Sequence, residues 1–311
     1  MKKVIMDVDT GVDDALAILY ALESRQLDVL GITTVNGNVP LEMVNVNTLK
    51  VLSLADRTDV PVHPGADRPL MRTSEHVHHI HGDDGIGNAL DDFSYSNQCQ
   101  EEFAADFIIE QAKNHPGEIT LIAVGPLTNL ALAFRKEPKL SEWLDEVVVM
   151  GGLVSEMGRG NKLPNSEFNI FTDAEAARIV FHSGTETTLV SLDVTKQTLL
   201  SNSDIDTLEG GKYHDFVRQS TEVYRAFSKE RFNLDGCALH DPLTVGYVLN
   251  RDFLRTEKHY VDVETISSLS YGQTICDFGN LWDRPPNVNI CTDVDGEGFV
   301  SHFLETLGKE G

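Results

Sequence analysis

Short apolar segments alternate with longer amphipathic segments along most of this chain. The apolar segments are VIMDV (4–8), VLGITTV (29–35), ITLIAV (119–124), EVVVMGG (146–152), TTLVSLD (187–193) and NVNICTDV (287–294). Continuous apolar runs of this length are typical of strands whose two faces are both buried. We predict a β-strand at each of them.

The segments between these strands have the apolar spacing of helices. They are residues 13–24, 41–55, 101–114, 127–137 and 173–184. Strands that alternate with helices predict an α/β fold with a mainly parallel sheet, covered by helices on both faces. Because no linker or low-complexity tract divides the 311 residues, we expect a single domain, 1–311, with a helical segment at about 195–250 that flanks the site.

Polar or glycine-containing segments follow several of the predicted strands. They are DVDTGVDD (7–14), NGN (36–38), VGPLTN (124–129) and MGG (150–152). In an open parallel sheet, ligands bind beyond the carboxyl ends of the strands, where these segments meet. The sequence therefore predicts an active site at the C-terminal strand ends.

The first of these segments holds four aspartates, Asp7, Asp9, Asp13 and Asp14, within eight residues. Carboxylates at ~4 Å repel by about 4 kcal/mol at an effective dielectric constant of 20, whereas a helix N-terminus stabilises each charge by only ~0.3–1 kcal/mol. A divalent cation would hold the group together, and all-oxygen ligands favour Ca²⁺ or Mg²⁺.

Two rival interpretations of this segment remain open. An N-terminal helix cap with surface acids would account for Asp13 and Asp14 but not for Asp7 and Asp9. The DVDTG stretch also resembles the DxDxT motif of haloacid-dehalogenase-like phosphatases, in which Asp7 would be the phosphorylated nucleophile. An EF-hand loop does not fit, because its ligands and its glycine fall at other offsets.

The stretch DVDTGVDDALAILYAL resembles the signature of the nucleoside hydrolases, the inosine–uridine-preferring ribohydrolase family, with its D-x-D-x-G-x-D-D-A pattern. Further segments match the family in the same order: TTVNGNV (33–39), HGDDGIG (81–87), AVGPLTNLALA (123–133), VVVMGG (147–152), NSEFNIFTDAEAA (165–177) and ALHDPLTVGYVL (238–249). The resemblance implies a Rossmann-like nucleoside hydrolase fold and hydrolysis of the N-glycosidic bond of a ribonucleoside to ribose and free base, with a preference for inosine and uridine or for pyrimidines.

The resemblance also implies a Ca²⁺ ion bound by Asp9, Asp14, the backbone carbonyl of Val124 and Asp241, with the ribose 2′- and 3′-hydroxyls completing its shell. Asp9 would in addition be the general base toward the attacking water. Asp13 would bind a ribose hydroxyl, and Asp7 would support the cluster from behind.

Further residues are implied to line the sugar and the base. By their match to the family motifs, the sugar would be bound by Asn38, Met150, Asn161, Glu167, Phe168 and Asn169. His240 would donate a proton to the departing base, since the pKa of histidine lies near neutrality. His81 and Tyr224 would lie near the base, while His76, His78 and His79 would belong to a polar surface loop. Phe227 and Phe232 would either contact the base or belong to the core.

Composition narrows the remaining possibilities. The formal net charge of −24 argues against a nucleic-acid partner, because phosphate backbones are bound by basic surfaces. Four scattered cysteines, no apolar run of membrane-spanning length and no signal peptide predict a cytoplasmic protein without a membrane partner. By the resemblance we expect a homo-oligomer, a tetramer or dimer. A non-catalytic nucleoside- or ribose-binding protein on the same scaffold remains an alternative.

Overall fold

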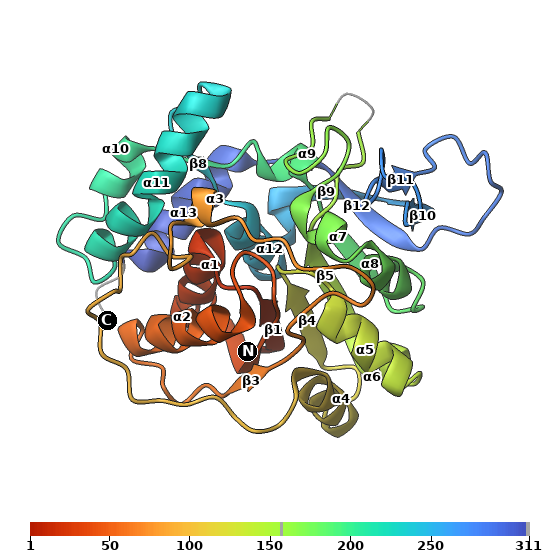
Figure 1. Ribbon diagram of the computed structural model, residues 1–311, viewed down its shortest axis with the longest axis horizontal. Helices are drawn as coiled ribbons and strands as arrows, with labels where there is room; N and C mark the ends of the chain where they lie inside the picture. Colours follow the sequence, from red (N-terminus) through yellow and green to blue (C-terminus); the bar gives the residue numbers. More distant parts are fainter. Residues whose placement is uncertain (156–157, 309–311) are drawn as a thin grey trace.

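Eight β-strands form one sheet in the computed structural model, which describes residues 1–155 and 158–308 (Figure 1). Its strands are β1 (Lys2–Val8), β2 (Leu27–Thr34), β3 (Val62–Pro64), β4 (Ile119–Ala123), β5 (Leu144–Met150), β6 (Thr187–Val190), β9 (Leu254–His259) and β12 (Val288–Val294). They lie in the order β3-β2-β1-β4-β5-β6-β12-β9. Every neighbouring pair is parallel except β12 and β9, which run antiparallel. The predicted mainly parallel, mixed sheet is confirmed.

Helices cover both faces of this sheet (Figure 1). They are α1 (Val12–Glu23), α2 (Leu41–Leu54), α3 (His78–His81), α4 (Ala104–Asn114), α5 (Thr128–Lys136), α6 (Leu140–Trp143), α7 (Phe168–Thr172), α8 (Ala174–Phe181), α9 (Leu192–Thr195), α10 (Asn202–Asp206), α11 (His214–Phe232), α12 (His240–Leu249) and α13 (Gly296–Leu307), with a 3₁₀ turn at Arg251–Phe253. Successive strand residues point to opposite faces, so Met6 and Val8 belong to one hydrophobic core and Ile5 to the other.

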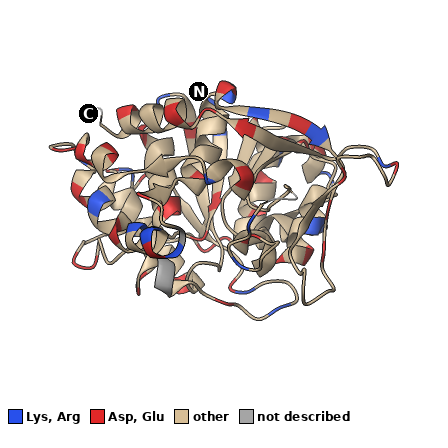
Figure 2. Cartoon of the chain, turned by 90° about the horizontal axis from the view of Figure 1, so that it is seen from above, with Lys and Arg blue, Asp and Glu red and all other residues tan. Residues whose placement is uncertain are grey.

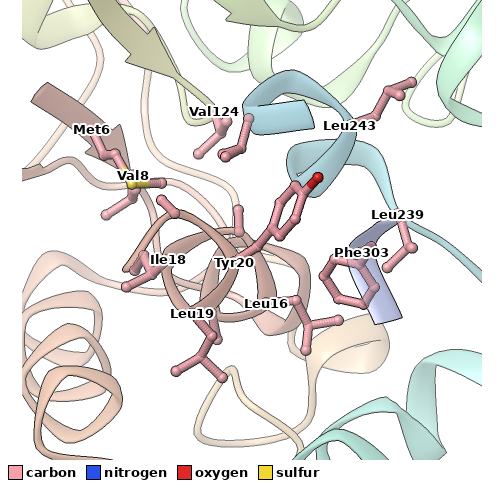
Figure 3. Close-up of a cluster of buried hydrophobic side chains, with 14 of the residues drawn as sticks. Met6, Val8, Leu16, Ile18, Leu19, Tyr20, Val124, Leu239, Leu243 and Phe303 are labelled. Atoms are coloured by element: carbon pink, nitrogen blue, oxygen red, sulfur yellow. The ribbon is translucent and has the colours of Figure 1, made fainter. Parts of the chain in front are cut away.

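The first core is built around α1, which is buried along nearly its whole length. Figure 3 shows Leu16 and Tyr20 of this helix with Leu243 of α12 and Phe303 of α13 around them. The rings of Tyr20 and Phe303 are 5.3 Å apart in an edge-to-face arrangement. This packing fixes α1 against α12, and the first turns of these two helices carry the acidic residues of the site.

The structure corrects several of the predicted elements. The strand predicted at 187–193 ends at Val190, because the hydroxyl of Ser191 donates to Asp193 at 2.7 Å and the chain turns into α9. The segment at 195–250 is not all helical, since it contains the short antiparallel pair β7 (Leu199–Leu200) and β8 (Cys237–Ala238). Strands β3 and β9, and the hairpin of β10 (Val261–Val263) and β11 (Thr274–Cys276), were missed; β9 is a polar edge strand without a continuous apolar run.

Acidic side chains outnumber basic ones over the chain, 49 against 25. Figure 2 shows Asp and Glu spread over the helices and loops, with Lys and Arg interspersed among them. Of the described helices, none has the length and apolar character needed to cross a bilayer.

Asn129, the second residue of α5, connects three segments at the carboxyl edge of the sheet. Its side-chain amide donates to Asp7 Oδ1 at 2.8 Å and to the carbonyl of Thr34 at 2.9 Å. Its carbonyl oxygen accepts from the backbone N–H of Ala66 at 2.8 Å. Asn129 is completely buried, so these groups have no access to bulk water as a replacement partner.

We therefore expect Asn129→Ala to lower the free energy of unfolding by about 2–5 kcal/mol, because it leaves several buried polar groups unpaired. The matched control is Asn97→Ala, which removes a half-buried asparagine bonded to Ser53 and should cost about 1 kcal/mol or less. Urea unfolding of both variants measures the difference. Equal losses would show that Asn129 does not have this bridging role.

Candidate active site

The first turns of α1 and α12 bring three carboxylates together. Asp13 and Asp14 are the second and third residues of α1, and Asp241 is the second residue of α12. One carboxylate oxygen from each lies within 4.8 Å of the other two, and the three residues are at most 7% exposed. Among the described residues, these three carboxylates lie close enough together to share one metal ion.

Asp9 is linked to this cluster through the backbone and through Asn38. The N–H of Asp9 donates to Asp14 Oδ1 at 3.0 Å, and that of Gly11 donates to Asp14 Oδ2 at 2.9 Å. Asn38 donates its backbone N–H to Asp9 Oδ2 at 2.7 Å and its side-chain amide to Asp14 Oδ2 at 3.2 Å. The segments that follow β1 and β2 therefore meet at the carboxylates.

The other oxygen of Asp9, Oδ1, is buried and has no hydrogen-bond partner among the described residues. Two glycines allow the backbone to approach this carboxylate. A Cβ at Gly37 would lie 2.0 Å from Asp9 Oδ2, and one at Gly125 would lie 2.9 Å from Asp9 Oδ1. A buried carboxyl oxygen without a partner, in a closely fitted polar site, is suited to bind a cation.

Burial raises the pKa of every carboxyl in this group. The pKa of Asp13 rises to about 8, first through burial and then through the charge of Asp14. Burial and neighbouring carboxylates also raise the pKa of Asp9 and Asp241 well above the usual range, and burial raises that of Asp14. Without a cation the group therefore keeps protons near neutral pH. The all-oxygen donor set and the unpaired oxygen fit a hard divalent cation that would displace them.

Asp7 lies behind the cluster and is completely buried. Its Oδ1 accepts from the hydroxyl of Thr33 at 2.5 Å and from Asn129 at 2.8 Å, and burial raises its pKa to about 7. A carboxyl held in this way is not open to a substrate. This placement argues against the phosphatase interpretation, which requires Asp7 as an accessible nucleophile.

Asn169 of α7 joins two other residues that the sequence singled out. Its amide donates to the carbonyl of Val124 at 2.7 Å and approaches Met150 Sδ at 3.5 Å. Glu167 precedes it and accepts the backbone N–H groups of Asn169, Ile170 and Gly152 at 2.8–3.0 Å. The Glu167 carboxylate therefore caps α7 and orders the turn after β5.

Asn161 and Phe168 occupy different surroundings although they are close in sequence. Asn161 is exposed, and its side-chain oxygen accepts the backbone N–H of Phe168 at 2.9 Å. Phe168 is buried, at 8% exposed, and the ammonium of Lys162 lies 5.8 Å from its ring centre. In this conformation Asn161 holds the start of α7 rather than the carboxylate cluster.

His81 and Tyr224 border the cluster on the side of α11. His81 Nδ1 accepts the backbone N–H of Val12 at 3.1 Å and lies 3.9 Å from Asp13 Oδ1. The rings of His81 and Tyr224 are 5.9 Å apart, and both residues are buried.

The residues before His81 differ from the surface loop that was predicted. Residues 78–81 form α3, and His76 Nε2 shares a 3.0 Å hydrogen bond with Asn36 Oδ1. The side chains of His79 and Phe232 lie outside the described part of the structure.

His240 begins α12, directly before Asp241, and is half-buried. Its Nδ1 shares a 2.7 Å hydrogen bond with the hydroxyl of Thr195, the last residue of α9. Burial, and then the charge of Lys196, lowers the pKa of His240 to about 3. The imidazole is therefore neutral at pH 7 in the free chain.

Three residues of this region were missed in the sequence. Asn129 holds Asp7, Thr195 holds His240, and Lys196 places a positive charge near the imidazole. Asn129 lies in the VGPLTN segment, which was expected at the strand ends, so its position was a usable signal. Nothing local marks Thr195 or Lys196, because the hydrogen bond of Thr195 and the charge of Lys196 act on a histidine about 45 positions away in the sequence.

Comparisons of sequence place this chain among known proteins. A sequence model described as "Inosine-uridine preferring nucleoside hydrolase" matches residues 4–301. The chain is 37% identical over 309 residues to the pyrimidine-specific ribonucleoside hydrolase RihA of Salmonella arizonae, covering 98% of this chain and 97% of that protein.

Solved structures lead to the same family. A plant nucleoside hydrolase, PpNRh1, has a TM-score of 0.93 at 32% identity, with 99% of each chain covered. A purine-preferring ribonucleoside hydrolase from Gardnerella vaginalis has a TM-score of 0.90 at 33% identity, with 99% of this chain and 98% of that chain covered. The predicted fold and the predicted type of enzyme are confirmed, and the chain belongs to the inosine–uridine preferring nucleoside hydrolase family.

Proposed function

We propose that this protein hydrolyses ribonucleosides to ribose and free base with the help of a Ca²⁺ ion held by its buried carboxylates. The observation that carries the proposal is the convergence of Asp13, Asp14 and Asp241 beside Asp9, whose Oδ1 has no partner among the described residues. A nucleoside hydrolase needs a group of this kind to bind polar ribose hydroxyls and to activate water.

Asp9, Asp14, Asp241 and the carbonyl of Val124 would hold the ion. Ca²⁺ accepts six to eight oxygen ligands in flexible geometry, whereas Mg²⁺ demands a near-octahedral shell and keeps several waters. A site with several carboxylates and a backbone carbonyl therefore suits Ca²⁺ better. When bound, the ion supplies a lowered pKa for a water ligand and a hard contact for ribose hydroxyls.

The chain's own residues would do the rest of the chemistry. Asp9 accepts the proton of the attacking water, and its raised pKa in the free chain would fall once a cation faces it. Asp13 and Asn38 hydrogen-bond the sugar. The carboxylate of Glu167 and the amide of Asn169 contribute negative potential where positive charge develops on the ribose ring.

His240 would assist the departing base. Since its imidazole is neutral at pH 7, it acts first as an N–H donor to a ring nitrogen or oxygen of the base. The hydrogen bond with Thr195 at Nδ1 fixes the ring so that Nε2 faces away from α9.

We further propose a preference for pyrimidine ribonucleosides or for inosine and uridine. Two histidines, His81 and His240, border the site, and both can form hydrogen bonds with the polar edge of a base. The 37% identity to RihA, which is described as pyrimidine-specific, supports the same preference. The alternative of a non-catalytic ribose-binding protein predicts binding of these nucleosides without turnover.

The first test is the release of reducing sugar from uridine, cytidine, inosine and adenosine in the presence of Ca²⁺. We expect Asp9→Ala to lower kcat by roughly 10²–10⁴-fold or more, because it removes a general base and a metal ligand. Asp92→Ala, which removes an exposed carboxylate, is the control and should retain wild-type activity. Deoxyuridine should be turned over at least about tenfold more slowly than uridine, because it lacks the hydroxyl that reaches the cation.

An inactive wild-type protein that still binds uridine would favour the binding-protein alternative. Comparable turnover of uridine and deoxyuridine would contradict the proposed contact of the cation with the 2′-hydroxyl.

The stability of the metal-free protein should depend on pH in a specific direction. Unfolded aspartates ionise near pH ~4, while folded Asp13 keeps its proton until about pH 8 and Asp7 until about pH 7. The folded chain thus binds more protons over that window, and its unfolding free energy in EDTA falls as the pH rises from about 4 to about 8. Stabilisation by added Ca²⁺ should increase as the pH rises toward 8, because fewer protons then compete with the ion for the carboxylates.

Urea unfolding with EDTA or Ca²⁺ at several pH values measures these effects. The matched variant is Asp13→Asn, whose profile in EDTA should be flatter by up to about 1.4 kcal/mol per pH unit. Identical slopes in the two proteins, or no effect of Ca²⁺ at alkaline pH, would contradict the assignment.

Loss of His240 should lower kcat most for substrates whose base needs a proton in order to leave. His240→Ala should lower kcat on uridine by roughly 10²–10⁴-fold, while 4-nitrophenyl riboside, whose leaving group needs no proton, should lose less than about tenfold. His115→Ala, at the end of α4, is the control. Equal losses on the two substrates would mean that His240 positions the ribose or the cation instead.

A further inference from the structure

Residues 65–77 join β3 to α3 and contain neither helix nor strand. Figure 1 shows this segment leaving β3, passing α7 and α8, and returning to α3. At its start, Ala66 donates its backbone N–H to Asn129 Oδ1 at 2.8 Å. Near its middle, Leu70 donates its backbone N–H to Asp173, which caps α8, at 2.8 Å. We call residues 65–77 the strap.

The C-terminal part of the strap is bound to the segment that follows β2. Asn36 donates its side-chain amide to the hydroxyl of Ser74 at 3.0 Å. The side-chain oxygen of Asn36 shares a 3.0 Å hydrogen bond with His76 Nε2. Asn36 is only 3% exposed, so it is itself fixed in the body of the protein. Glu75, which lies between Ser74 and His76, therefore has a well-defined backbone position.

The end of the strap is connected to the carboxylates of the site. Val77 donates its backbone N–H to the carbonyl of Asn38 at 2.9 Å. Asn38 in turn donates to Asp9 at 2.7 Å and to Asp14 at 3.2 Å. A displacement of the strap would therefore be transmitted to the residues around the carboxylates.

A turn at residues 158–166 precedes α7 on the other side of the site. Within it, Lys162 donates its backbone N–H to the carbonyl of Ser166 at 3.3 Å. The ammonium of Lys162 lies 5.2 Å from the ring centre of Phe171 and 5.8 Å from that of Phe168. Aromatic faces attract cations at such distances, so the two rings of α7 hold the ammonium in place.

An ion pair joins the strap to this turn. Lys162 Nζ lies 2.6 Å from Glu75 Oε2, although the two residues are 87 positions apart in the sequence. The side chain of Lys162 is 21% exposed and that of Glu75 is 60% exposed. Ion pairs with access to water are weak, because water and salt compete with the partner. A contact of this strength can form and break within each catalytic cycle.

The ion pair completes a closed ring of contacts around the site. On the sheet side, Asn169 of α7 donates to the carbonyl of Val124 at 2.7 Å, and Val124 donates its backbone N–H to the carbonyl of Asp7 at 2.9 Å. Strands β1 and β4 separate β2 from β5 along this edge. One half of the ring is thus built on the sheet, whereas the other half consists of the strap, the ion pair and α7.

We propose that Glu75 and Lys162 are positioning residues that close the strap over the ribose and so set the affinity for the sugar. The inference rests on the proposed function, in which Asn38 and Asn169 bind the ribose from opposite sides. The pair acts through these two residues and does not contact the reacting atoms. The enclosure is shared by the ground state and the transition state, so its loss should change KM more than kcat.

The test compares the steady-state kinetics of the wild type, Glu75→Gln and Lys162→Gln on uridine and on 4-nitrophenyl riboside. Both variants should raise KM by roughly three- to tenfold and change kcat by less than about twofold. The increase should be the same for the two substrates, because they share the ribose and differ in the leaving group. An equal loss of kcat and no change in KM would overturn the proposal.

The matched control is Glu118→Gln. Glu118 pairs with Lys3 at 2.8 Å, with side-chain exposures of 55% and 29% that resemble those of the proposed pair. Lys3 and Glu118 lie at the amino ends of β1 and β4, at the edge of the sheet opposite the site. This variant should keep the KM of the wild type.

Reversal of the two charges separates their attraction from other effects of substitution. The double variant Glu75→Lys/Lys162→Glu should have a lower KM than Glu75→Lys alone, because the attraction is restored with opposite polarity. Nucleosides are uncharged, so the KM of the wild type should also rise with added NaCl, while that of Glu75→Gln should not. A double variant no better than Glu75→Lys would overturn the proposal.

Hydrogen exchange without substrate distinguishes failure of this proposal from failure of the proposed function. Peptides covering residues 65–77 should exchange at least about twofold faster in Glu75→Gln than in the wild type or in Glu118→Gln, because the strap opens more often. If the wild type hydrolyses no nucleoside, the proposed function fails, and the exchange rates still decide whether the pair closes the strap. Equal exchange in the three proteins would overturn the proposal.

Discussion

The confinement of several carboxylates at the starts of two packed helices is the constraint on which the site depends. Two unit charges 4.8 Å apart repel by roughly 3 kcal/mol at an effective dielectric constant of 20, and Asp13, Asp14 and Asp241 form three such pairs. The dipoles of the two helices stabilise each favourably placed charge by at most about 2 kcal/mol. Protons or a cation must therefore neutralise the group, and the raised pKa values express this requirement.

The spacing of these carboxylates is set by the hydrophobic core and by the sheet rather than by the loops themselves. The packing of α1 against α12 through Leu16, Tyr20 and Leu243 places the two helix starts side by side. Parallel pairing of β1 with β2 and β4 then brings Asp9, Asn38 and Val124 to the same edge. Core packing is rigid because interiors are close-packed, so the carboxylates are held in place before any ligand arrives.

Much of this arrangement could be predicted from the sequence because its signals are local. The apolar runs of β1, β2, β4 and β5 are continuous. The segment DVDTGVDD begins in the last two residues of β1, so the position of the strand predicts the position of the acids. Strand β9 could not be found in this way, because its residues LRTEKH are polar on an edge. The short helix α9 was hidden for a different reason, since one local hydrogen bond of Ser191 ends an otherwise apolar run.

The contacts that escaped prediction are those between distant segments. Asn129 bridges to Asp7 across more than a hundred residues, and the Thr195 hydroxyl meets His240 across 45. Asn161 matched the family spacing, yet in the structure its oxygen accepts from the backbone of Phe168, which spacing alone does not reveal. A motif gives the residue type and the order along the chain, while burial and the partner of each polar atom come from the fold.

If His240 assists the departing base as proposed, its surroundings determine whether it does so as a neutral or as a charged imidazole. With a pKa of about 3, protonating the imidazole at pH 7 costs roughly 5 kcal/mol. In the tautomer in which Nδ1 accepts from the Thr195 hydroxyl, the neutral imidazole would carry its N–H on Nε2 and could donate a hydrogen bond without that cost. As negative charge develops on the base, it favours positive charge on the ring and raises its pKa. The charge of Lys196 opposes that change. In the proposed mechanism it would therefore limit full proton transfer to bases that develop enough negative charge.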